Sequence, residues 1–225
     1  MASPTESNKV ELKEVAIIIM GQSPPGRTYN NNGIGTPLLN GPTEFGLSHP
    51  AVTLWTTVPT KKCNKDDLLF CVRGSTTGRM NRADREYCIG RGICAIRATA
   101  RDNDTYFIYY SIVNELPRLL TKCAGSVFPN ISLSDLESFE ISWPNENDRT
   151  NVVAILKSLD NKISLNNQEN INLEEVGKAL FKHWFIDFEF PDEQVDRSRP
   201  GHRRTDRIGK PDEGGEKEGR IAGLV

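Results

Sequence analysis

Apolar and polar residues alternate over short stretches of the first 144 residues, as they do in partly buried β-strands. This alternation, together with short apolar runs, predicts strands at 52–57, 68–72, 93–96 and 139–141. The runs at 68–72 and 93–96 are apolar throughout much of their length, which is typical of strands that are covered on both faces. The pattern therefore indicates a domain built mainly from short strands.

Helical spacing replaces this pattern in two places within the same domain. Apolar residues recur every three or four positions in 105–116, and Pro117 is expected to end or kink that helix. The segment 134–136 resembles a single capped turn just before the last strand. Helices and strands together predict an α+β fold for residues 1–144.

A long stretch without proline follows Pro144, and its key positions step alternately by four and three residues over five heptads. This spacing is that of a coiled-coil seam. We call these positions the seam and predict that they mediate dimerisation. They are Val152, Leu156, Leu159, Ile163, Asn166, Asn170, Leu173, Leu180 and Trp184, with Gly177 at an intervening seam position.

The seam predicts one coiled-coil helix over 145–190, capped by Asn145, Asn147 or Asp148 and about 60 Å long at about 1.5 Å per residue. So narrow a stripe needs a second helix, which a second copy or another protein is expected to supply. The alternative is an amphipathic helix that folds back on the first domain. Residues 191–225 are rich in glycine and charge and poor in apolar residues, which predicts a disordered tail.

The net charge of the 225 residues is −2, which excludes the simplest signature of nucleic-acid binding, an extremely basic domain. Residues 61–101 nevertheless hold ten Lys and Arg against four Asp and Glu, a local net charge of +6. The centre of this stretch, 73–79, is a Gly, Ser and Thr turn between two arginines, which suits contacts with phosphate or guanine. A second polar loop, 21–32, is stiffened by proline and carries side chains that can read base edges.

These two regions supply the candidate DNA-binding residues. They are Gln22, Arg27, Tyr29, Asn30, Lys61, Lys62, Arg73, Ser75, Thr76, Thr77, Arg79, Arg82, Arg85 and Arg91. Local sequence leaves two alternatives open: a solvated hairpin whose arginines pair with nearby carboxylates, and a rigid loop without a ligand.

The sequence contains none of the catalytic motifs that we sought. It has no P-loop, G-x-S-x-G or H-E-x-x-H pattern, and 23–26 lacks the aromatic residue of amino-methyltransferase loops. The five cysteines do not follow metal-binding spacing and are expected to be packed thiols. We therefore predict no catalytic residues, no metal and no cofactor in this chain. No secretory signal or membrane-spanning run is visible, so we expect a cytoplasmic protein without membrane contacts.

Four segments carry a resemblance to a known family. They are 19–25, 68–76, 125–132, and the helix from 155–163 through 180–188. In their order and spacing these segments resemble the specificity subunit of type I restriction–modification systems (HsdS).

This resemblance implies a target recognition domain over 1–144, which binds one half of a split DNA site, and a conserved spacer helix over 145–190. It implies that the chain is not an enzyme. Methyltransferase subunits would bring S-adenosylmethionine and methylate adenine, and a restriction or translocase subunit would be a further partner. Family members commonly carry two recognition domains and two helices, whereas this chain has one of each and resembles a half-length form.

A half-length form would pair its seam with that of a second copy. The dimer would read two identical, inverted half-sites in double-stranded DNA, roughly one helical turn apart. Two other functions remain as alternatives: a free-standing dimeric DNA-binding protein with a regulatory role, and an enzyme with an unrecognised site.

Overall fold

The structure is a computed structural model that describes residues 8–122 and 130–188. Three features of the sequence analysis fall on other residues. The predicted tail at 191–225, most of the resemblance segment at 125–132, and Cys123 lie outside the described residues.

The chain divides into two compact units, residues 1–173 and 174–225. The first unit contains every strand of the described ranges and most of the long helix α4 (Glu146–Phe181). In the second unit the structure describes the end of α4 and a π-helical turn, Lys182–Ile186. Within the described ranges, no helix is both long and apolar enough to cross a membrane.

The main sheet of the first unit has four strands, and each pair of neighbours is antiparallel. Their order is β2 (Ala16–Met20), β10 (Ile93–Ala98), β7 (Leu68–Cys71) and β8 (Met80–Arg82). The two central strands, β7 and β10, are almost entirely buried, which explains their nearly continuous apolar sequences. The strands predicted at 68–72 and 93–96 are confirmed.

Alternate residues of the two central strands enter two separate hydrophobic clusters. Phe70 and its cross-strand neighbour Cys94 belong to the cluster that contains α2 (Asp102–Lys122). The next pair, Leu69 and Ala95, belongs to a cluster shared with the second sheet. Because side chains of a strand alternate between its faces, this register gives the sheet a core on both sides.

The second sheet has five strands, and only its β4–β9 pair is parallel. The order is β3 (Tyr29–Asn30), β5 (Trp55–Thr56), β4 (Thr36–Leu39), β9 (Tyr87–Ile89) and β6 (Lys62–Cys63). The strand predicted at 52–57 is shorter than expected, because only Trp55 and Thr56 pair with β3 and β4.

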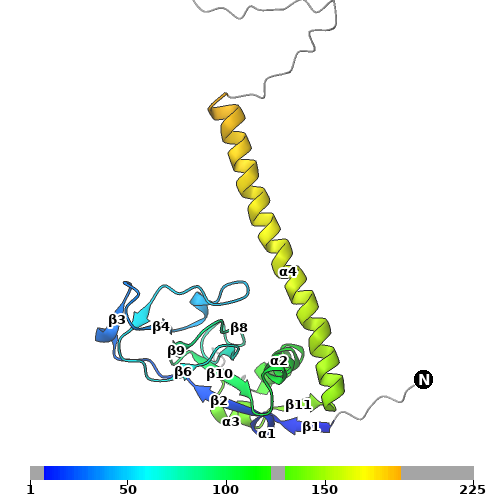
Figure 1. Cartoon of the computed structure of the whole chain (residues 1–225). Coiled ribbons are helices and arrows are strands. Elements are labelled where there is room, and N and C mark those ends of the chain that lie inside the picture. The colour runs from blue at the N-terminus through cyan, green and yellow to red at the C-terminus, as the bar shows by residue number, and fades with distance from the viewer. Residues whose placement is uncertain (1–7, 123–129, 189–225) are drawn as a thin grey trace, which may run out of the picture. The chain divides into compact units, whose positions relative to one another are not determined.

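A separate antiparallel pair joins β1 (Asn8–Glu11) to β11 (Glu140–Trp143). The strand predicted at 139–141 is thus present but is shifted toward its C-terminal end. Leu12 follows β1 directly, and its amide donates to the carbonyl oxygen of Phe139 at 2.9 Å. This pair brings the chain to the start of α4, so β11 positions the long helix (Figure 1).

Helix α2 continues through Pro117 for more than a full turn. The helix therefore does not end at Pro117, whereas the kink that was the other expectation stays a prediction. Proline lacks an amide hydrogen and removes one helical hydrogen bond. Leu119 is fully buried, however, and Leu116 and Leu120 pack against the same cluster. Burial of these three side chains outweighs the lost hydrogen bond.

Short helical segments complete the first unit. They are α1 (Leu12–Val15), α3 (Leu133–Glu137) and two 3-10 turns, Gly26–Thr28 and Pro42–Glu44. The capped turn predicted at 134–136 lies within α3, and its cap is Ser132. The Ser132 hydroxyl accepts from the Asp135 amide at 3.2 Å, and the Asp135 carboxylate accepts from the Ser132 amide at 2.8 Å.

Helix α4 begins where the sequence predicted, with Asn145 as its cap. The Asn145 side-chain oxygen accepts from the amide of Asp148 at 3.0 Å, and its amide nitrogen donates to the Asp148 carboxylate at 2.8 Å. The predicted α+β class, with one long helix after the strand-rich domain, is confirmed.

Candidate nucleic-acid interface and helix junction

The turn that joins β7 to β8 is shaped by its own backbone. Gly74 and Gly78 have φ values of 90° and 93°, a region that favours glycine. Thr77 donates to the Gly74 carbonyl oxygen from its amide at 3.1 Å and from its hydroxyl at 2.7 Å. Arg73 and Ser75 are exposed in this turn, so both candidate side chains are accessible to a ligand.

The second candidate loop is fastened to strand ends of both sheets. The amides of Gly21 and Gln22 donate to the carbonyl oxygens of Ile93 and Ile89, each at 2.9 Å. A Cβ at Gly21 would lie 2.6 Å from the Ile93 carbonyl oxygen, so the close approach requires glycine. The loop is therefore held against the sheets, and the exposed Gln22 side chain projects from a fixed base.

The two loops meet at a shallow hollow of about 740 Å³, which we call the basic hollow. It is lined by Ser23, Pro24, Gly26, Tyr29, Asn40, Arg73, Arg91 and Gly92. Three candidate residues, Tyr29, Arg73 and Arg91, are thus brought together from distant parts of the sequence. Asn40 and Ser23 also line the hollow, although the sequence analysis did not select them.

The basic hollow contains two arginines, Arg73 and Arg91. Within the described ranges, neither Arg73 nor Arg91 forms an ion pair. The Tyr29 hydroxyl donates to the Pro24 carbonyl oxygen at 3.1 Å, which fixes the ring beside them. Two guanidinium groups next to an aromatic ring can bind phosphate oxygens or base edges.

Several other candidate cations already have carboxylate partners. Lys62 pairs with Glu86 at 2.7 Å, and Arg85 pairs with Asp84 at 3.1 Å. Such exposed pairs contribute little to stability, but each offsets the charge that its cation would present to DNA. The basic stretch 61–101 is therefore less positive at its surface than its composition indicates.

Arg97 belongs to the same basic stretch but serves the fold. Its Nε and Nη2 atoms donate to the two carboxylate oxygens of Asp67 at 2.6 and 2.7 Å. Asp67 is fully buried, so this bidentate pair satisfies a carboxylate that would otherwise be costly to bury.

Three candidate residues make contacts outside the basic hollow. The side-chain oxygen of Asn30 accepts from the amides of Asn32 and Ile34, both at 3.1 Å, which shapes its own turn. Arg79 donates to a backbone carbonyl oxygen at 3.3 Å, and Arg82 lies over the ring of Tyr106.

The remaining candidates are accessible to different degrees. Arg27 and Lys61 are exposed, and Thr76 is half-buried with its hydroxyl 3.7 Å from the sulfur of Cys71. The structure thus divides the fourteen candidates among several surfaces. Their roles in DNA binding stay predictions.

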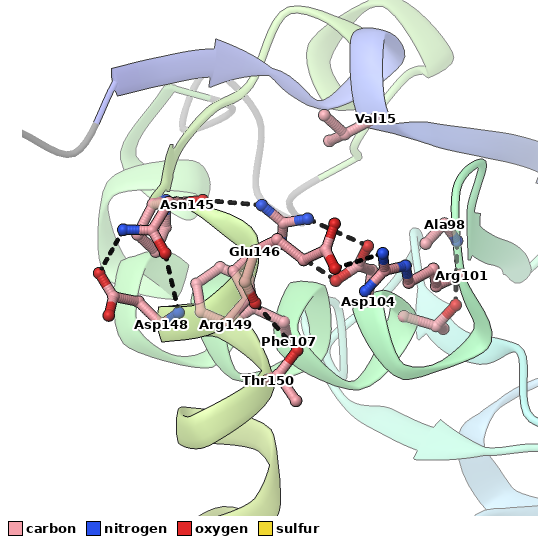
Figure 2. Close-up of polar contacts among 12 residues, drawn as sticks. Val15, Ala98, Arg101, Asp104, Phe107, Asn145, Glu146, Asp148, Arg149 and Thr150 are labelled. Carbon is pink, nitrogen blue, oxygen red and sulfur yellow. Dashed lines mark hydrogen bonds and ion pairs between the residues drawn. The ribbon is translucent and has the colours of Figure 1, made fainter.

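A buried ion pair docks the start of α4 on α2 (Figure 2). Arg149 donates from Nε and Nη2 to the two oxygens of Asp104, at 3.0 and 3.3 Å, and from Nη1 to the Pro144 carbonyl oxygen at 2.7 Å. The guanidinium group also lies 4.2 Å from the centre of the Trp143 ring. Because the pair is buried and hydrogen-bonded on several sides, loss of one partner would leave an uncompensated charge.

Further along α4, the carboxylate of Asp160 accepts hydrogen bonds from two tyrosines of α2. The Tyr110 hydroxyl lies 2.7 and 2.8 Å from the two carboxylate oxygens, and the Tyr106 hydroxyl donates to one of them. Burial, and then the bond to Asp160, raises the pKa of Tyr110 to about 12, and the pKa of Tyr106 is raised for the same reasons. We call Tyr106, Tyr110 and Asp160 the tyrosine clamp.

Val153 and Lys157 lie on α4 between the ion pair and the clamp. Val153 is buried against Tyr106 and Phe107. The Lys157 ammonium group donates to the side-chain oxygen of Asn103 at 2.6 Å and lies 5.3 Å from the centre of the Tyr106 ring. Positions 149, 153, 157 and 160 therefore form one docking face of the helix.

A second hollow, of about 610 Å³, opens beside the tyrosine clamp. Its lining includes His49, Arg82, Tyr106, Tyr109, Lys157 and Asp160. It holds both acidic and basic side chains, in contrast to the basic hollow.

The seam occupies a different face of α4 from the docking residues. Leu159 is 55% exposed and Ile163 is 58% exposed, whereas Val153 is only 3% exposed. Leu156 is half-buried and lies at the border of the two faces. Only the first turns of α4 therefore pack on the domain. The alternative of a helix that folds back on the domain holds for that part of the helix alone. In the second unit, Leu180 is exposed and Phe181 stacks on Phe185 with 5.1 Å between ring centres.

The docking face was not predicted from the sequence. A signal was present, because 149, 153, 157 and 160 also recur at steps of three and four. Because three of these residues are charged, a search for apolar periodicity does not detect them. Asp104, in the first turn of α2, is the acidic partner that this charged row requires.

The predicted packed thiols are confirmed for the described cysteines. Cys63, Cys71, Cys88 and Cys94 are all buried and free. Burial raises the pKa of the Cys63 thiol to about 12. Among the described residues, no group of three or more His, Cys, Asp and Glu side chains is placed to hold a metal ion.

A family model for the type I restriction modification DNA specificity domain matches residues 4–175. The chain belongs to this family, which confirms the resemblance seen in the sequence.

Relatives and solved structures agree with this assignment. The chain is 35% identical over 163 residues to the putative type I restriction enzyme MjaX specificity subunit of Methanocaldococcus jannaschii, a match that covers 72% of this chain and 38% of that protein. The crystal structure of the HsdS subunit from Thermoanaerobacter tengcongensis aligns with a TM-score of 0.60 and 29% identity, covering 82% of this chain and 46% of that one.

A third match comes from a structural study of complex assembly and conformational transition of the type I R-M system. Its TM-score is 0.61 and its identity 31%, covering 80% of this chain and 45% of that one. This chain therefore spans less than half the length of the relatives that it matches.

Proposed function

We propose that this chain is the DNA-recognition subunit of a type I restriction–modification methyltransferase complex. Two copies would pair through α4 and read a bipartite, palindromic site, one half-site for each recognition domain. The chain would have no catalytic role. An adenine-N6 methyltransferase subunit would supply the chemistry with S-adenosylmethionine, and a restriction or translocase subunit would be a further partner.

One observation carries this proposal: a member of the specificity-domain family has a helix that docks with one face and leaves an adjacent apolar seam exposed. Leu159 and Ile163 lie on this seam and are more than half exposed. A row of exposed apolar residues at coiled-coil spacing is stable in water when another helix covers it. A second copy of the chain offers the same seam, and a two-fold axis would then relate the two recognition domains.

The basic hollow supports the DNA-binding part of the proposal. Arg73 and Arg91 are free to contact phosphate or base edges, and Tyr29 provides an aromatic surface beside them. One recognition domain would make few phosphate contacts, so the isolated dimer is expected to bind DNA weakly. Assembly with the methyltransferase subunit would add further contacts with the same DNA.

The proposal is tested by co-expressing the chain with its cognate methyltransferase subunit and mapping N6-methyladenine across the host genome. We expect one methylated motif that consists of two inverted half-sites around an unread spacer. A stable complex that methylates no bipartite motif would contradict the proposal.

Experiments on the purified chain separate the two other functions. A nanomolar footprint by the chain alone at physiological salt would favour a free-standing regulatory protein. Methylation or cleavage of DNA by the chain alone would show an enzyme with an unrecognised site.

A further inference from the structure

Polar contacts hold α4 against α2 at the two ends of the docking face, with Val153 and the Lys157–Asn103 hydrogen bond between them. At one end is the buried pair of Arg149 and Asp104, and at the other is the tyrosine clamp at Asp160. The two attachment points on α4 are about 16 Å apart, at about 1.5 Å for each residue. One point would leave the helix free to pivot, whereas two points fix the direction of its axis.

The two attachments differ in what they contribute. The Arg149–Asp104 pair is buried, and Val153 packs beside it, so this end already fixes the helix start to the domain. In the clamp, Tyr106 is buried, whereas Tyr110 and Asp160 are partly exposed at the border of the second hollow. The start of α4 is already docked on the domain without these hydrogen bonds. Their main consequence is to prevent α4 from tilting about its buried end.

A tilt at the clamp is amplified along the helix. Leu173 lies about 36 Å from Arg149, the buried end of the helix, and a rotation of about 5.5° about that end would move it by about 3.5 Å. The rise of one base pair in duplex DNA is about 3.4 Å. An angular change that is small for a helix junction therefore corresponds to one base pair of spacing on the DNA.

We propose that the tyrosine clamp is a positioning device: by fixing the angle between the recognition domain and α4, Asp160 with Tyr106 and Tyr110 determines how many base pairs separate the two half-sites. This inference rests on the proposed function, because it requires two copies paired through the seam. The clamp does not line the basic hollow, and the seam residues nearest to it, Leu156 and Ile163, lie at its border, so its proposed effect is on the direction of α4.

The test measures spacer tolerance in the complex with the methyltransferase subunit. The substrate is a pool of duplexes with the same inverted half-sites and spacers from two base pairs shorter to two longer than in the genomic motif. The readout is the fraction of methylated adenine for each spacer. The variants are Asp160→Ala and Tyr110→Phe, and the control is Glu175→Ala, which removes an exposed α4 carboxylate that lies off the seam.

We expect the wild type and Glu175→Ala to prefer one spacer. In Asp160→Ala the preference over spacers one base pair longer or shorter should fall by roughly fivefold, with the half-site bases unchanged, which corresponds to about 1 kcal/mol. Asp160→Asn, whose side-chain oxygen still accepts from a tyrosine hydroxyl, should recover part of the preference. Tyr110→Phe removes one hydroxyl and keeps the ring, so it gives the same readout if Asp160→Ala fails to fold.

The outcomes separate this inference from the function on which it rests. If the wild type methylates no bipartite motif, the proposed function fails. If the wild type prefers one spacer and Asp160→Ala and Tyr110→Phe keep the same preference, the clamp proposal is overturned and the proposed function stands. A loss of methylation at every spacer by the same factor would also overturn it, because that is the effect of a merely structural contact.

Discussion

Arg73, Arg85 and Arg97 show that residues of the same type in one basic stretch have different roles. Arg73 lines the basic hollow without an ion pair within the described ranges, Arg85 pairs with Asp84 at the surface, and Arg97 binds the buried Asp67. Sequence gives all three the same charge. Only the position of the nearest carboxylate determines which of them can act on DNA.

This difference predicts the effect of removing charge on DNA affinity. Replacing Arg73 and Arg91 by Ala in the methyltransferase complex should weaken binding by at least about tenfold, since the variant cannot form the hydrogen bonds that the two charged groups would make. It should also reduce the slope of log affinity against log salt by about 0.9 for each phosphate that the variant no longer neutralises. Fluorescence anisotropy with labelled duplex over a range of salt concentrations measures both quantities.

The matched control removes two positive charges that already have partners. Lys62→Ala with Arg85→Ala changes the net charge by the same amount, but both cations are paired with carboxylates. We expect a smaller decrease in affinity and an almost unchanged salt slope. Equal decreases in the two double variants would mean that net charge matters and that the basic hollow has no special role.

At the scale of elements, the junction between α2 and α4 contains two ion pairs in very different surroundings. Arg149 and Asp104 are buried, whereas Arg101 and Glu146 are both about half exposed. Both pairs join the first turn of α4 to the start of α2 or the residue before it (Figure 2). They form a natural comparison of buried and exposed electrostatics.

Arg149→Ala should lower the free energy of unfolding by about 3–5 kcal/mol, because it leaves Asp104 buried without its counter-charge. Arg101→Ala should change it by less than about 1 kcal/mol, because water screens the exposed pair. Urea unfolding followed by circular dichroism measures both values. Similar effects for the two variants would show that burial does not determine the strength of this junction.

At the scale of the whole molecule, the exposed seam predicts the oligomeric state. Leu159→Asp together with Ile163→Asp should give a folded monomer, because charged side chains cannot be buried in a coiled-coil interface without partners. The helical content of the first unit should persist, since neither residue belongs to the docking face. Light scattering coupled to size-exclusion chromatography measures the mass.

The control places the same charge on another face of α4. Leu165 is 52% exposed and lies off the seam, so Leu165→Asp should remain a dimer. If the seam double variant stays dimeric, or if Leu165→Asp also becomes a monomer, the dimer does not use the seam as proposed.

The sequence by itself determined the elements whose physical signal is local. The central strands were visible as apolar runs, α4 as a heptad pattern with an asparagine cap, and the specificity-domain family through short segments in a fixed order. The limits of α2 and of the strand at 52–57 could not be predicted in this way. The first depends on burial of Leu119 against a distant sheet, and the second depends on how many residues find a pairing partner.

The tertiary structure decided which polar residues act together. It brought Tyr29, Arg73 and Arg91 into one hollow and neutralised other cations with carboxylates far along the chain. It also gave α4 a second face, in which charged residues dock on α2 and leave the seam uncovered. Local sequence encodes the charge of each residue and the spacing of the apolar positions. An ion pair or a helix junction depends instead on distances between segments, which only the folded chain defines.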